Sequence, residues 1–154
     1  MEFYSFDTPF GMMALAEEEG AITRLWLPNA PMPRMMPHPT PLLEEGCRQL
    51  LEYLRGERKQ FDLPLAMQGT AFQKKVWAEL VRIPWGETRT YREIALAVDC
   101  PKGFRAVGMA NNRNPLPIFI PCHRVVGSDG SLTGYAGGLE LKQALLALEG
   151  IGGA

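Results

Sequence analysis

Residues 90–113 read TYREIALAVDCPKGFRAVGMANNR, and this stretch decides the architecture of the C-terminal half of the chain. Thr90 followed by Glu93 is a capping box, which marks the start of a helix. The Cys100-Pro101 step ends that helix, and a second one is expected from about residue 102 to 113. Two short helices with a tight break are typical of helix-turn-helix DNA-binding units, although periodicity alone fits an ordinary helical hairpin equally well.

The second of these helices is expected to have two different sides. The spacing places Phe104 and Val107 toward the core and puts Arg105, Met109 and Asn112 on the opposite side. Small residues are frequent along this helix, and they permit either close backbone approach to a ligand or tight helix packing. These small residues are Gly103, Ala106, Gly108 and Ala110.

The N-terminal part of the chain predicts a small α+β unit. Short apolar segments predict three strands, with a hairpin turn at residues 17–20. Six prolines from Pro28 to Pro41 predict a loop, and Thr40 with Pro41 then begins a helix that ends near Gly56 and includes Cys47 as a buried thiol. The expected strands cover residues 3–6, 12–15 and 22–27.

A second unit is expected to begin near Gly69. Thr70 and Gln73 form another capping box at the start of a helix. A glycine-rich loop at residues 128–138 precedes a last helix at 139–148. The chain is therefore predicted to be an α+β protein of two domains, covering residues 1–66 and 67–154.

Composition excludes several classes of protein. Three cysteines without a C-x-x-C pair argue against a disulfide framework and against a zinc ribbon, and with two histidines no metal site is expected. No apolar stretch is long enough to span a bilayer, and the N-terminus lacks the basic flank of a signal peptide. We therefore expect a cytoplasmic protein, associated with the nucleoid in a prokaryote or nuclear in a eukaryote.

The charges are unevenly distributed although the net charge is only -1. Residues 70–124 hold nine Lys/Arg against four Asp/Glu, whereas residues 1–69 hold six against ten. A basic segment masked by an acidic remainder indicates a surface that could neutralise phosphates, although charge runs are also common on ordinary solvated surfaces.

The segment Pro121-Cys122-His123-Arg124-Val125 carries the chemistry. A thiol becomes a nucleophile when a base accepts its proton and a positive charge stabilises the thiolate, and His123 and Arg124 are residues of these two types. Neighbouring side chains on a strand point to opposite faces. His123 can therefore serve Cys122 only through a turn or a bridging water.

Glu149 lies at the C-terminal end of the last predicted helix, where the helix dipole disfavours a carboxylate. It could hold the imidazole of His123 in the proton-accepting tautomer, as the third group of a triad does. It could equally be an exposed glutamate, and these residues alone leave both interpretations open.

Three segments resemble the O6-alkylguanine-DNA alkyltransferase family, also called the methylated-DNA-protein-cysteine methyltransferases. They are IPCHRVVGSDGSLTGYAGGLELKQALLALEG, the preceding RAVGMANNRNPLPIFI, and FQKKVWAELVRIPWGETRTYREIA. The match runs from about Thr70 to Gly150, whereas the N-terminal third matches only in pattern. The resemblance implies an N-terminal ribonuclease H-like α/β domain with a short antiparallel sheet and a mainly helical C-terminal domain like a winged helix-turn-helix.

The resemblance also implies a role for each matching residue. Cys122 would accept the alkyl group irreversibly in a single turnover, His123 would pass its proton through water to Glu149, and Asn114 would brace the active-site turn. Tyr91 would hydrogen-bond the guanine. Arg105 would enter the base stack. Further expected DNA contacts are Ala106, Gly108, Asn112 and Arg113, and the expected guanine pocket is formed by Tyr91, Pro117, Val125, Tyr135 and Ala136.

The partner implied by this resemblance is double-stranded DNA containing O6-alkylguanine, bound through its minor groove by a monomer without a cofactor. O4-alkylthymine is a second candidate substrate. Three alternatives remain: a binder of alkylated DNA that performs no chemistry, a hydrolase using Cys122 and His123, and a small DNA-binding regulator.

Overall fold

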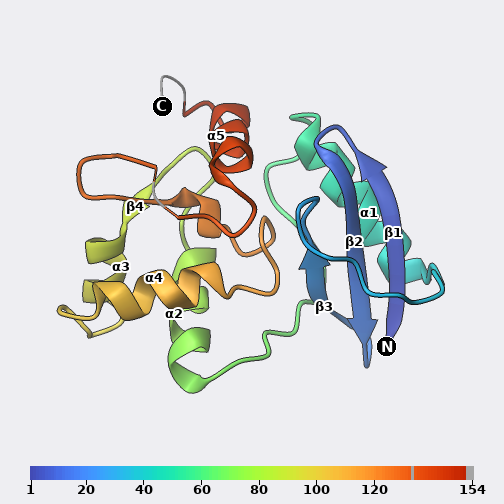
Figure 1. Cartoon of the computed structure of the whole chain (residues 1–154), viewed down its shortest axis with the longest axis horizontal. Helices are drawn as coiled ribbons and strands as arrows, with labels where there is room; N and C mark the ends of the chain where they lie inside the picture. The colour runs from blue at the N-terminus through green and yellow to red at the C-terminus, as the bar shows by residue number, and fades with distance from the viewer. Residues whose placement is uncertain (133, 152–154) are drawn as a thin grey trace. The chain divides into compact units, whose positions relative to one another are not determined.

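The computed structural model describes residues 1–132 and 134–151, and the chain divides into two compact units, Met1–Gln68 and Gly69–Ala154. The sequence placed the boundary between residues 66 and 67. Figure 1 shows a sheet with one long helix in the N-terminal unit and mainly helices in the C-terminal unit, which confirms the predicted α+β class. None of the helices within the described ranges is long and apolar enough to cross a membrane.

The N-terminal unit contains a three-stranded antiparallel sheet in the order β1-β2-β3. Its turn between β2 and β3 has positive φ at both Glu19 (51°) and Gly20 (80°), as a tight two-residue hairpin of the primed type requires. The three predicted strands are confirmed, and each begins or ends within a few residues of its predicted limits. The strands are β1 (Glu2–Thr8), β2 (Gly11–Glu18) and β3 (Ala21–Trp26).

Helix α1 (Pro41–Leu54) packs on this sheet. Thr40 caps it by accepting a hydrogen bond from the Leu43 backbone N–H at 3.1 Å. A Cβ at Gly46 would lie 2.9 Å from methyl groups of both Leu15 and Ile22, so only glycine allows this close approach. Cys47 is half-buried rather than a core thiol, because the buried stripe passes instead through Gly46, Gln49 and Leu50.

The C-terminal unit is built around α2 (Ala71–Val81), α3 (Tyr91–Ala97) and α4 (Phe104–Asn112). Both predicted capping boxes are present, at the start of α2 and at the start of α3. The Trp77 indole N–H donates to the Ala110 carbonyl at 2.9 Å and joins α2 to α4. Between α3 and α4, a Cβ at Gly103 would lie 2.3 Å from Cys100 Sγ, so this glycine serves tight packing.

Two short elements bring distant parts of the C-terminal unit together. Strand β4 (Arg89–Thr90) pairs in parallel with β5 (Val125–Val126), so the start of α3 lies beside the segment that follows Cys122. Helix α5 (Leu139–Leu148) follows the glycine-rich loop and packs against the turn containing Cys122. These long-range contacts assemble the candidate site.

The prediction for Phe104 is wrong. The buried residues of α4 are Val107, Ala110 and Asn111, whereas Phe104 is 53% exposed. Phe104 is in line with the buried stripe, three residues before Val107, but it occupies the first turn of the helix, where no described element covers it. Periodicity identifies the apolar stripe of a helix but does not show which part of it packs against other elements.

Candidate active site

Cys122 begins a buried 3-10 turn, η1 (Cys122–Arg124), that follows Pro121. The backbone is therefore not extended here, so the side chains of Cys122 and His123 do not alternate between opposite faces as they would on a strand. Asn111 Nδ2 donates to the Cys122 carbonyl at 3.3 Å, and Asn114 Nδ2 donates to the Ile120 carbonyl at 2.8 Å. The two asparagines thus hold the backbone on both sides of the thiol.

Glu149 is the anchor of the site. Its side chain is fully buried, and its Oε2 lies 2.7 Å from His123 Nε2. Arg124 donates two hydrogen bonds to the same carboxylate, from Nε to Oε1 at 2.7 Å and from Nη2 to Oε2 at 2.9 Å. Its Nη1 donates to the Ile83 carbonyl. This structure excludes the exposed-glutamate interpretation, since the residue that caps α5 is 1% exposed.

Burial fixes the charge state of His123. It lowers the pKa of the imidazole below the ordinary 6.5, against the opposing effect of Glu149, so the ring is neutral at neutral pH. A carboxylate held by a guanidinium is an acceptor only. His123 therefore carries its hydrogen on Nε2 toward Glu149, and Nδ1 is the basic nitrogen.

The thiol of Cys122 is protonated in this environment. Burial raises its pKa to about 11, while an Asn114 hydrogen bond, the charge of Lys142 and a Tyr135 hydrogen bond act in the opposite direction. A thiol with such a pKa needs a base in order to react at neutral pH. His123, held by Glu149, is the candidate for that base.

Lys142 also belongs to the candidate site, although no sequence motif points to it. It is fully buried in α5, its Nζ donates to the Val125 carbonyl at 2.6 Å, and burial lowers its pKa to about 8. Its charge lowers the pKa of the Cys122 thiol, whereas Arg124 is engaged by Glu149 and Ile83. A lysine three residues before Leu145 and seven before Glu149, on the buried stripe of a helix, was the available signal.

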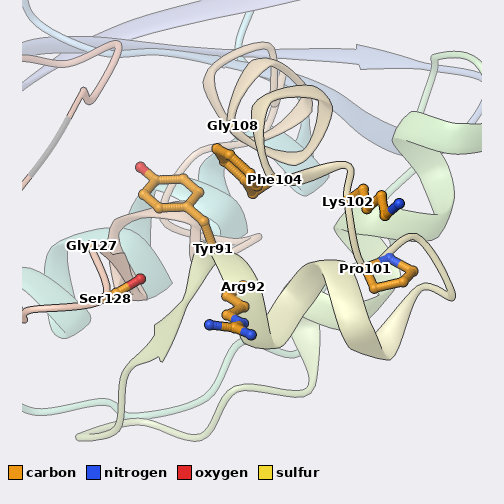
Figure 2. Close-up of a pocket in the computed structure, with 8 residues that line it drawn as sticks. All are labelled: Tyr91, Arg92, Pro101, Lys102, Phe104, Gly108, Gly127 and Ser128. Carbon is orange, nitrogen blue, oxygen red and sulfur yellow. The ribbon is translucent and has the colours of Figure 1, made fainter.

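Tyr91 links this centre to an open pocket. Lys142 Nζ lies 6.0 Å from the centroid of the Tyr91 ring, a cation–π contact, and the ring itself lines a cavity of about 580 Å³. A Cβ at Gly108 would lie 3.9 Å from the ring, so the α4 backbone passes close beside it. Figure 2 shows the lining residues, which are Tyr91, Arg92, Pro101, Lys102, Phe104, Gly108, Gly127 and Ser128.

The remaining predicted site residues fall into two groups. Arg105, Ala106 and Asn112 are exposed on α4, and Arg113 is exposed directly after it, so all four are accessible to a large ligand. Pro117, Val125 and Tyr135 are buried, and Ala136 is exposed. Of this second group, Tyr135 is brought to the thiol of Cys122.

Comparison with known sequences gives two family matches that together span most of the chain. Residues 2–67 match the ribonuclease-like domain of 6-O-methylguanine DNA methyltransferase, and residues 71–151 match the DNA binding domain of the same family.

Individual relatives agree with these matches over nearly their whole length. The chain is 51% identical to the constitutive methylated-DNA--protein-cysteine methyltransferase of Bacillus subtilis, covering 98% of this chain and 97% of that protein. A methyltransferase of the same name from Methanosarcina acetivorans is 47% identical, covering 97% and 99%. The crystal structure of Mycobacterium tuberculosis OGT in complex with DNA superposes with a TM-score of 0.90 at 41% identity, covering 97% of this chain and 92% of that one.

Proposed function

The chain belongs to the 6-O-methylguanine DNA methyltransferase family and is a DNA-binding repair methyltransferase; from that premise we propose that it takes alkyl groups from O6-alkylguanine in duplex DNA onto Cys122. The observation that supports Cys122 as the acceptor is its environment. The thiol lies in a turn with His123 and Arg124, both fixed by Glu149, and Lys142 provides a positive charge.

In the proposed reaction, His123 Nδ1 accepts the proton of Cys122 through a bridging water, and Glu149 stabilises the resulting imidazolium. The thiolate attacks the alkyl carbon, an S–C bond forms, and the C–O6 bond breaks with its electron pair passing to the guanine. The Tyr91 hydroxyl donates a hydrogen bond to the guanine ring as this negative charge develops. The need for a base follows from the raised pKa of Cys122.

The product is a thioether on Cys122, and the reaction therefore ends there. A thioether has no hydrolysable bond, so each protein molecule acts once. O4-alkylthymine presents the same type of alkyl–oxygen bond and is proposed as a second substrate, to be tested in parallel with O6-methylguanine.

The target atom is stacked inside a duplex, so we propose that the nucleotide is extruded, at a cost of a few kcal/mol. The exposed face of α4 carries the residues proposed to contact the minor groove. Arg105 offsets part of the cost by entering the gap in the base stack. Ala106, Gly108, Asn112 and Arg113 are proposed to lie against the sugar-phosphate backbone of a duplex bound by one protein molecule.

A stoichiometry measurement tests this proposal. The protein is mixed with an excess of duplex containing O6-methylguanine, and the restored guanine is counted. We expect one equivalent per protein molecule followed by no further reaction, none with Cys122→Ala, and an unchanged yield with Cys47→Ala as the matched thiol control. Continued turnover, or a full yield from Cys122→Ala, would contradict the proposal.

A further inference from the structure

Phe104 has no place in the chemistry described so far, yet its position is unusual. It is a large apolar side chain that is 53% exposed, on the first turn of α4 and next to Arg105. Its ring also lines the 580 Å³ cavity. Figure 2 shows the rings of Phe104, from α4, and of Tyr91, from α3, directed into the same space.

The cavity combines two kinds of surface. Tyr91 and Phe104 give it an aromatic wall, and the α4 backbone at Gly108 passes close to the Tyr91 ring. Arg92, Lys102 and Ser128 provide two cations and a hydroxyl around the same space. A nucleotide backbone has matching chemistry, because the phosphate is anionic whereas the sugar and the base face are apolar.

We propose that Phe104 is a positioning residue that enters the minor groove beside Arg105 and packs on the sugar and base face of the nucleotide next to the extruded guanine. This inference rests on the proposed function. An apolar wedge at a base step holds the opened duplex apart, as in other minor-groove proteins. In this proposal Phe104 acts on the geometry of the DNA and not on the reacting atoms, and the described residues that line the cavity do not include Cys122.

A comparison of two substrates tests the proposal. Phe104→Ala should slow alkyl transfer from duplex O6-methylguanine by about tenfold, the loss expected for one stacking contact, and leave the reaction with free O6-benzylguanine within about twofold. Phe104→Tyr, which keeps the ring, should restore the duplex rate. Leu96→Ala is the matched control, since Leu96 is 56% exposed on α3 and lies outside the cavity lining.

Equal slowing of both substrates by Phe104→Ala would overturn the proposal, as would an unchanged duplex rate. Adduct formation by the wild-type protein distinguishes failure of the inference about Phe104 from failure of the proposed function. If it forms no adduct with the duplex, the proposed function fails and this inference fails with it. If it forms one and Phe104→Ala reacts equally fast, only the inference about Phe104 fails.

Salt dependence gives a second, independent readout. In a Cys122→Ala background, which binds without transfer, the affinity for the O6-methylguanine duplex is measured over a range of salt concentrations. Phe104→Ala should weaken binding by the same factor at every concentration, because an apolar contact releases no counterions. A reduced slope of log affinity against log salt would show loss of phosphate contacts and would contradict the wedge.

Discussion

At the residue scale, the site works because burial determines which groups carry charge. His123 is neutral and Cys122 is protonated, while Arg124 and Glu149 form a bidentate buried pair. Removing one member of such a pair leaves an uncompensated buried charge, which typically costs about 3–5 kcal/mol. The pair is therefore a rigid support for the imidazole.

Lys142 provides the first residue-scale prediction. Lys142→Met removes the positive charge that favours the Cys122 thiolate while keeping a long side chain. Alkylation of Cys122 by free O6-benzylguanine at neutral pH should slow by about tenfold, the effect of one unit of pKa on the thiolate fraction. Lys74→Met, at an exposed position on α2, is the control. Equal rates for wild type and Lys142→Met would exclude this role.

His123 gives a prediction about stability and pH. Its folded-state pKa lies below the ordinary 6.5, so below that pH the unfolded chain binds a proton that the folded chain does not. The free energy of unfolding should therefore fall as the pH drops below 6.5, by up to about 1.4 kcal/mol per pH unit. Urea unfolding at several pH values measures this slope. His123→Gln should have a shallower slope, and parallel slopes for the two proteins would refute the assignment.

The sequence predicts some residues of the site better than others. Cys122, His123 and Glu149 could be named from a motif and a resemblance. Lys142 was missed because lysines are normally exposed, and its burial becomes evident only when the buried face of α5 is known. Phe104 was wrongly predicted to face the core because an aromatic residue on an apolar stripe is normally buried. Only the fold shows that this end of the stripe is exposed.

At the element scale, α3 is the helix that places Tyr91. Tyr91 is its first residue, directly after the capping residue Thr90, whose side chain accepts from the Glu93 N–H at 3.1 Å. Thr90 also pairs with Val126 across the parallel strands, so the cap is tied to the segment that follows Cys122.

The matched capping boxes of α2 and α3 give an element-scale prediction. Thr70→Ala and Thr90→Ala remove equivalent caps, so each should lower the free energy of unfolding by about 1 kcal/mol. Only Thr90→Ala should slow alkyl transfer, several-fold, because only α3 positions Tyr91. Denaturant unfolding and single-turnover kinetics measure the two effects. Equal slowing by both variants would indicate a general effect of stability instead.

The helix starts could be predicted because they depend on sequence signals within a few residues. Capping boxes and the Thr40-Pro41 start are encoded within a few residues, and all three are present as predicted. The strands β4 and β5 consist of two residues each, and they exist only because segments far apart in the sequence pair. The 3-10 turn at Cys122 likewise depends on asparagines from α4 and from the loop after it.

At the scale of the whole molecule, charge separates the two units. The N-terminal unit is acidic, and several of its arginines are engaged in ion pairs, such as Arg48 with Glu45 and Glu52. Residues 70–124 hold nine Lys/Arg against four Asp/Glu, and Arg92, Lys102, Arg105 and Arg113 among them are exposed. The C-terminal unit thus carries the surface that suits phosphates.

This distribution predicts the salt dependence of DNA binding. Lys102→Ala should reduce the slope of log affinity against log salt by about 1, the value for one lost phosphate contact. Arg48→Ala, which removes one positive charge from the N-terminal unit, should leave the slope unchanged. Fluorescence anisotropy with an undamaged duplex measures both. If the two variants change the slope equally, net charge rather than the surface of the C-terminal unit governs binding.

The central claim, that the sulfur of Cys122 becomes the permanent carrier of the alkyl group, is tested most directly by mass spectrometry. The intact protein is weighed after incubation with the O6-methylguanine duplex, and its peptides are then mapped. We expect a gain of one methyl in place of hydrogen, located on Cys122 and stable over time. A protein of unchanged mass, or a methyl group on Cys47 or Cys100, would contradict it.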